Sequence, residues 1–229
     1  MKKYYIMAIK HGYTPAMNDL ALYYETVEKD YEEAKKYYMM AAKLNHVNSM
    51  NNLALLFCDI FKDYEEMKKY YEMAIKLGST IAMNDLGYYY FSIEKDYFKM
   101  EFYYLMAIEK NNVNSMYNMG FYHQTESKNY EKMEYYYMMA IERGSMEAMN
   151  NMGNYCEHIL KNYDEMKKYY EMAIEMGSKA AMLQLSLYYM NIEKNEELME
   201  KYFQIGIKSK CRNCMIERAK YCSKKSNKN

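Results

Sequence analysis

The chain has 229 residues, in which 31 basic side chains balance 31 acidic ones, so no net charge attracts nucleic acid or an anionic membrane. Hydrophobic residues make up 51% of the sequence, which is enough for a core, and the single proline and eight glycines are typical of helices joined by short turns. No apolar run approaches the length of a membrane span, and the N-terminus lacks a signal-peptide pattern. We therefore expect a soluble, cytoplasmic protein with no membrane partner.

A unit of 33 residues repeats from Met1 without insertion or deletion. Its opening motif, MKKYYIMAIK in the first copy, starts again at positions 34, 67, 100, 133, 166 and 199. A fixed period of this length is typical of stacked supersecondary units. The sequence therefore predicts one repeat domain over residues 1–229, whose function is usually a surface and not a reaction. A second anchor has the same spacing and confirms the register: Met17, Met50, Met83, Met116, Met149, Met182 and Met215.

Each copy is predicted to form two antiparallel helices, as residues 79–110 illustrate. Ser79 or Thr80 is a good N-cap for the first helix, and an apolar arc follows at helical spacing. Residues 94–96 end that arc, and the second helix is expected from about Tyr97 to Lys110. The inward residues are expected to be Met83, Leu86, Gly87, Tyr90 and Ile93 on the first helix, and Met100, Tyr103, Tyr104, Ala107 and Ile108 on the second.

The two ends of the array differ. Residues 211–229 are predicted to form a capping helix with a polar tail, because Arg218 and Lys225 replace inward apolar residues. At the other end, Tyr4 and Met7 are unchanged from the interior copies and have no preceding helix to cover them. We therefore expect an apolar edge there that frays, binds a partner or allows self-association.

One copy carries a family resemblance. The order Ala74, Gly78, Ala82, Leu86, Gly87 and Tyr89, followed by Asp96, Tyr97, Met100, Tyr103, Tyr104 and Ala107, resembles the Sel1-like repeat, a relative of the tetratricopeptide repeat. The turn inside each copy is shorter than in that family, and Met often replaces the small residue that opens the second helix. The resemblance covers essentially the whole chain and implies a right-handed α-α superhelix (solenoid) of about 14 helices, two per copy. It also implies a non-catalytic adaptor or scaffold that binds proteins.

The composition has a further resemblance. Its bias toward Lys, Asn, Tyr, Ile and Met is typical of an AT-rich genome, and long arrays of this kind resemble gene families of giant viruses. A viral origin would place the protein in the host cytoplasm.

Five cysteines raise the question of a metal site. Cys211 and Cys214 have the spacing of half a zinc site. The repeat register instead places Cys156, Cys214 and Cys222 in columns that other copies fill with core residues. We therefore expect free thiols, no metal and no cofactor. No nucleotide-binding glycine loop or catalytic cysteine with a positioned histidine can be read, so the chain is not expected to be an enzyme.

The outer arc of the first helices carries the candidate binding surface. Asparagines recur there beside a column of aliphatic and aromatic residues, and in related superhelices the first helices line the concave face. Amides can pair with a peptide backbone while apolar positions take its side chains. Alternatively, the amides are solvated helix caps and the apolar column packs on the next helix. The candidate peptide-binding residues are Asn51, Asn84, Tyr88, Tyr117, Phe121, Asn150 and Asn154.

The alternative function is nucleic-acid binding, because helical repeats can read one base per unit and tyrosines can stack on bases. Phosphate contacts would need a basic stripe, but lysine pairs such as Lys68 and Lys69 lie on second helices beside glutamates. We therefore expect a protein partner of unknown identity and no nucleic acid.

Overall fold

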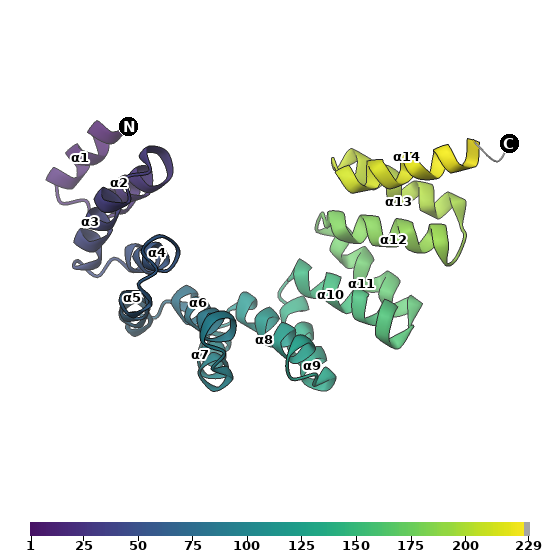
Figure 1. Cartoon of the computed structure of the whole chain (residues 1–229), viewed down its shortest axis with the longest axis horizontal. Helices are drawn as coiled ribbons and strands as arrows, with labels where there is room; N and C mark the ends of the chain where they lie inside the picture. The colour runs from purple at the N-terminus through teal and green to yellow at the C-terminus, as the bar shows by residue number, and fades with distance from the viewer. Residues whose placement is uncertain (227–229) are drawn as a thin grey trace. The chain divides into compact units, whose positions relative to one another are not determined.

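The computed structural model describes residues 1–226, and in that range the chain forms fourteen α-helices and no strand (Figure 1). The first helices of the copies are α2 (Pro15–Tyr23), α4 (Val47–Leu56), α6 (Thr80–Tyr89), α8 (Val113–Thr125), α10 (Met146–Tyr155), α12 (Lys179–Asn191) and α14 (Arg212–Ser226). The second helices are α1 (Lys2–Lys10), α3 (Tyr31–Ala42), α5 (Tyr64–Lys76), α7 (Tyr97–Glu109), α9 (Tyr130–Ile141), α11 (Tyr163–Glu175) and α13 (Glu196–Lys208). The prediction of an all-α repeat array is confirmed.

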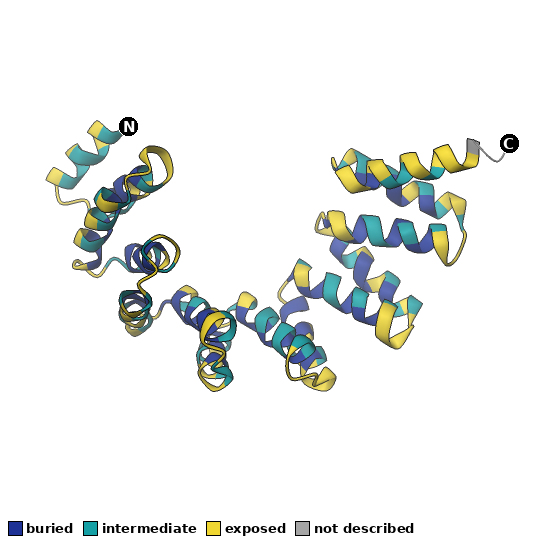
Figure 2. Ribbon diagram, viewed as in Figure 1, coloured by how far each residue is buried: buried dark blue, intermediate teal, exposed yellow. Residues whose placement is uncertain are grey.

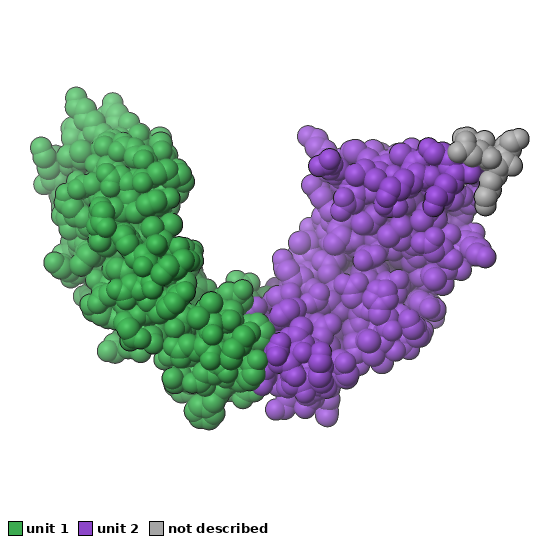
Figure 3. Space-filling view, in the orientation of Figure 1, with its two compact units in different colours: residues 1–115 green, residues 116–229 purple. Residues whose placement is uncertain are grey.

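The chain divides into two compact units, Met1–Ser115 and Met116–Asn229 (Figure 3). Within each unit a helix packs mainly on its neighbours in sequence. The pairs α2/α3, α4/α5 and α6/α7 lie in unit 1, and α10/α11 and α12/α13 lie in unit 2. This local pattern is the one expected of a repeat array. A single domain over residues 1–229 remains a prediction.

Side-chain caps fix where the helices begin. The Ser79 hydroxyl accepts the backbone N–H of Ala82 at 3.1 Å, and Asp96 accepts that of Lys99 at the same distance. These bonds satisfy donors that the first turn of a helix leaves unpaired. Glycines such as Gly78, with φ of +88°, end the second helices in the left-handed conformation, as predicted.

The core lies between the two helices of each copy (Figure 2). One second-helix column is completely buried from α3 to α13, and glycines on three of the facing first helices make room for its rings. A Cβ added at Gly153 would lie 2.5 Å from the ring of Tyr170. The column consists of Tyr38, Tyr71, Tyr104, Tyr137, Tyr170 and Phe203.

Four first helices end in a π-helical turn, which the sequence did not predict. The turns are η1 (Tyr24–Glu28), η2 (Phe57–Phe61), η3 (Tyr90–Glu94) and η4 (Cys156–Leu160). The expectation that Ile93 lies inward is wrong: Tyr90, at the start of η3, is buried, but Ile93, near its end, is 53% exposed. The core contacts of this helix therefore end at the first residue of the π-turn.

The end helices differ as expected. No residue of α1 is buried, and Tyr4 is 73% exposed. On α14, Arg218 forms a two-pronged ion pair with Glu200, with N–O distances of 2.7–2.9 Å, and Lys225 pairs with Glu196. The last three residues of the predicted polar tail, 227–229, lie outside the described residues.

Candidate functional site

The asparagine column joins successive first helices. At two first helices with Ser at the N-cap, that hydroxyl donates to the asparagine of the preceding copy: Ser79 to Asn51 at 3.2 Å, and Ser178 to Asn150 at 2.9 Å. The N-cap of α10 is also a serine, Ser145, but the preceding copy has Tyr117 in place of the asparagine. Where the N-cap is another residue, a serine one turn later makes the bond instead: Ser49 to Asn18 at 3.1 Å, and Ser115 to Asn84 at 3.0 Å. The side-chain carbonyls of this column therefore bind the repeat stack itself.

Asn51 consequently contradicts the expectation of an open amide ladder, because only 4% of it is exposed. Asn84 and Asn150 are half-buried. A signal in the sequence could have revealed this role. In the sixth copy Leu183 takes the place of the asparagine. On the next first helix, α14, Cys211 and Cys214 occupy the two positions at which other copies have serine. In that copy amide and hydroxyl are lost together, as in a bonded pair, although the fourth copy loses the amide at Tyr117 and the next helix keeps Ser145.

The neighbouring apolar column remains at the surface. Leu22, Leu55 and Tyr88 are exposed in unit 1, with Tyr88 55% exposed, while Phe121 and Asn154 are half-buried in unit 2. A second exposed apolar column runs beside the first and was missed by the sequence prediction. It consists of Val27, Ile60, Ile93, Ile159 and Ile192.

The other candidates in unit 2 take part in internal contacts. Tyr117 stacks on Phe121, with ring centroids 6.3 Å apart, and its hydroxyl accepts a long bond from Asn151. The side-chain carbonyl of Asn154 accepts a 2.8 Å bond from the Tyr170 hydroxyl. Of the seven candidates, Tyr88 is the most open to a partner.

Most of the buried tyrosines in this column have a hydroxyl acceptor on the first helix that packs against them or on its π-turn. Tyr38 donates to Glu25 at 2.7 Å, and Tyr137 donates to Gln124 at 2.6 Å. Tyr170 donates to Glu157 at 3.0 Å. Burial raises the pKa of these tyrosines and keeps the hydroxyls protonated as donors. Where the column has Phe203 in place of tyrosine, the acceptor position holds Met190.

A lysine follows every first helix from the first to the sixth copy, in the left-handed conformation. These residues are exposed, with φ of 54–58°: Lys29, Lys62, Lys95, Lys128, Lys161 and Lys194. At the turns between copies the chain mostly uses Gly or Asn for this conformation, as at Gly78 and Asn111. Within residues 1–226 none of the six lysines forms an ion pair. The sequence prediction had considered only the lysines of the second helices.

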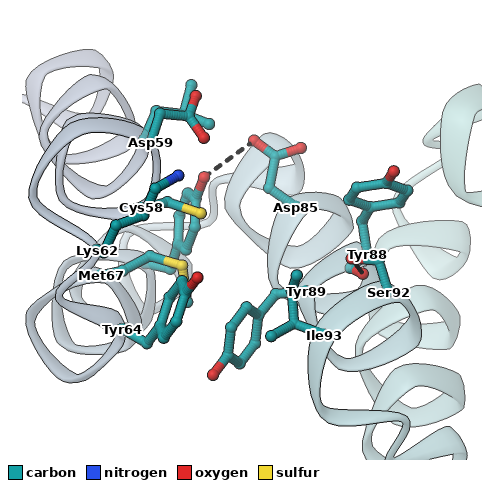
Figure 4. A pocket seen from close by; sticks show the side chains of 12 residues that line it. Cys58, Asp59, Lys62, Tyr64, Met67, Asp85, Tyr88, Tyr89, Ser92 and Ile93 are labelled. Atoms are coloured by element: carbon teal, nitrogen blue, oxygen red, sulfur yellow. Dashed lines mark hydrogen bonds between the residues drawn. The ribbon is translucent and has the colours of Figure 1, made fainter.

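Notches lie between successive first helices, close to these columns. In unit 1 one notch of about 310 Å³ is lined by Lys29, Leu55 and Ile60. A larger cavity of about 420 Å³ lies between η2 and α6 and is lined by Leu55, Tyr88 and Ile93 (Figure 4). In unit 2 a notch of about 390 Å³ is lined by Phe121, Lys128, Tyr130, Tyr155 and Ile159, together with Gln124, Thr125 and Asn151.

All five cysteines are free thiols. Cys156 and Cys214 are buried, as their columns predicted, but Cys222 is exposed, because no described helix covers that column of α14. Among the described residues no three His, Cys, Asp or Glu side chains are grouped as metal ligands.

None of the described helices is both long and apolar enough to span a bilayer. No protein-family model matches the chain, and no curated protein matches it in sequence.

Solved structures do resemble it in fold. A Sel1 repeat protein from Oxalobacter formigenes is 21% identical, with a TM-score of 0.65 over 86% of this chain and 88% of that one. The immunity protein PA5088 from Pseudomonas aeruginosa is 18% identical, with a TM-score of 0.59 over 87% and 82% of the two chains. The immunity protein Pa5087 from the same organism is 18% identical, with a TM-score of 0.54 over 79% and 75%. The chain therefore has the helical-repeat fold of Sel1 repeat proteins.

Proposed function

We propose that the chain is a non-catalytic scaffold that binds an extended segment of a partner protein along its first helices. The observation that carries this proposal is the pair of exposed apolar columns, which recur in the three copies of unit 1 beside notches large enough for side chains. Leu22, Leu55 and Tyr88 form the first column in unit 1. Apolar groups that stay exposed at one register in successive copies suit a partner that runs across the stack.

The asparagines have a smaller part in this proposal than the sequence prediction gave them. The side-chain carbonyls of Asn84 and Asn150 are engaged by serines, so they support the stack. The proposed contact residues are Leu55 and Tyr88 in unit 1, and Tyr117, Phe121 and Asn154 in unit 2.

A pull-down followed by substitution tests this surface. Replacing Leu55 and Tyr88 together by Ala should weaken the binding of the captured partner by about 2 kcal/mol or more, because a few anchor residues contribute most of the binding free energy of such interfaces. The fold should be retained. Leu86→Ala is the matched control, since Leu86 is fully buried on the same helix and its loss should cost about 2–5 kcal/mol of stability. Binding that survives the double replacement contradicts the proposal.

Nucleic-acid binding remains the second candidate function, and the lysine at the end of six first helices favours it. The absence of net charge and the carboxylates around the unit 1 notches oppose it. Fluorescence anisotropy with a single-stranded oligonucleotide distinguishes the two. Binding that falls steeply with salt and is lost on replacing Lys29 and Lys62 would support nucleic acid.

A further inference from the structure

The cavity between η2 and α6 differs from the other notches because of one residue. Tyr71 is a member of the buried tyrosine column, and its acceptor position holds Cys58, where other copies have Glu25, Gln124 or Glu157. A cysteine is smaller and is a weak acceptor. Cys58 lines the cavity of about 420 Å³, to which Tyr71 also contributes.

In the absence of that acceptor, the Tyr71 hydroxyl faces a carboxylate. The Tyr71 hydroxyl turns to Asp85 on α6, but at 3.5 Å this contact is long for an O–H···O bond. The other donor to Asp85 is the amide of Asn84, at 3.0 Å. An ionised carboxylate can accept about four hydrogen bonds. In the equivalent place of unit 2, Asn151 donates a 2.9 Å hydrogen bond to the Tyr137 hydroxyl. An amide can donate this bond, whereas an ionised carboxylate such as that of Asp85 can only accept one.

A second carboxylate and several aromatic rings complete the cavity. Asp59 on η2 and Asp85 on α6 lie on opposite walls (Figure 4). Lys62 also lines the cavity, but it pairs with neither carboxylate, and two acidic groups against one ammonium leave an excess of negative charge. Tyr64 and Tyr88 contribute phenol rings, which attract cations through their faces.

We propose that this cavity receives the ammonium or guanidinium group of a basic side chain from the bound protein segment. The proposal rests on the function proposed above and names one anchor of that segment. A cation would give Asp85 a charge-assisted hydrogen bond and would lie among the phenol rings. The unit 2 notch contains Lys128 and no carboxylate, so it would not take the same group. A basic anchor would therefore fix the position of the segment on unit 1.

Nuclear magnetic resonance with two small probes tests the cavity directly. N-acetyl-arginine methylamide carries the cation, and the citrulline analogue has the same shape without the charge. The arginine probe should shift the methyl signal of Met67 and the amide signals of Cys58 and Asp85 in a saturable way. The citrulline probe should bind about tenfold more weakly or worse, because charge-assisted hydrogen bonds are the strong ones. Equal responses to both probes, or none to either, overturn the proposal.

Three variants locate the binding. Asp85→Asn introduces the residue that three other copies carry, so the fold should be retained while the arginine response is lost. Cys58→Gln introduces the residue of the fourth copy, where Gln124 accepts the hydroxyl of Tyr137, and by turning the Tyr71 hydroxyl away from Asp85 it should change the arginine response. Asp19→Asn is the matched control, because Asp19 occupies the same column on α2 and does not line this cavity. An arginine response that persists in Asp85→Asn places the cation elsewhere and overturns the proposal.

The partner captured by pull-down separates the two proposals. If its binding requires Leu55 and Tyr88 but is unchanged by Asp85→Asn, the surface is correct and the basic anchor is wrong. If the arginine probe binds but no partner requires Leu55 and Tyr88, the protein-segment assignment fails together with the proposed function. Loss of partner binding by about tenfold in Asp85→Asn, with Asp19→Asn unaffected, supports both.

Discussion

The hydroxyl of Ser79 donates a 3.2 Å hydrogen bond to the side-chain carbonyl of Asn51, and thereby joins two successive first helices through buried polar groups. Both residues are buried, so the bond has no water to replace it. We predict that Asn51→Ala lowers the free energy of unfolding by about 1–3 kcal/mol, the usual cost of leaving a buried group unpaired. Urea denaturation measures the change.

The control for this prediction is Asn48→Ala on the same helix. Asn48 is exposed, and its replacement should change stability by no more than about 0.5 kcal/mol. Equal effects of the two substitutions would mean that the bond between the helices contributes nothing.

The hydroxyl of Tyr170 and the carboxylate of Glu157 form a second pair, whose apolar counterpart is present in the chain as Phe203 and Met190. Tyr170→Phe alone removes a donor and should cost about 1–2 kcal/mol. Adding Glu157→Met should recover part of that loss, because the apolar pair needs no donor. A double-mutant cycle measures the coupling. Costs that simply add would show that the two residues act independently.

The fold could be predicted because the 33-residue period fixes which residues share a column. The burial of the two columns that contain Tyr104 and Ala107 can be predicted from helical spacing alone. The position of Ile93 was not predicted, because it lies inside the π-turn η3, which no residue type in the sequence marks. Asn51 was misplaced for a different reason: an amide suits solvent and a buried bond equally well, and only its pairing with Ser79 distinguishes them.

The candidate site was predictable to a smaller extent. Tyr88 was correctly placed at the surface, since its column faces away from the core. The cavity beside it depends on Cys58, whose small size matters only because the Tyr71 ring ends there. That relation joins residues 13 positions apart on two helices, and no local pattern reveals it.

The left-handed lysines provide a third prediction. Lys161 has φ of +55°, a conformation that costs a residue with a Cβ more than it costs glycine. Lys161→Gly should therefore raise the free energy of unfolding by about 0.5–1 kcal/mol. Gly177 has φ of +90°, so Gly177→Ala places a Cβ in a left-handed conformation and should lower the free energy of unfolding. Thermal unfolding measures both, and a destabilised Lys161→Gly variant would show that the lysine makes a stabilising contact.

The pH dependence of stability provides a test of Asp85. Burial raises the pKa of this carboxyl above its ordinary value of 3.8, while hydrogen bonds from Asn84 and Tyr71 oppose the shift. The folded protein therefore holds this proton more tightly than the unfolded chain does. The corresponding stabilisation is fully present below pH 3.8 and is lost as the pH rises through the folded pKa.

Asp85→Asn removes this titration, so the stability of the variant relative to the parent protein should increase as the pH rises from below 3.8 to neutral. Asp59, Lys62 and Cys58 face the same cavity and are present in both proteins, so their contributions largely cancel in the difference. Thermal unfolding at a series of pH values measures it. A difference for Asp85→Asn that is constant with pH, or that decreases as the pH rises, would show that Asp85 is not a desolvated carboxylate and would remove the electrostatic reason for a cation in the cavity.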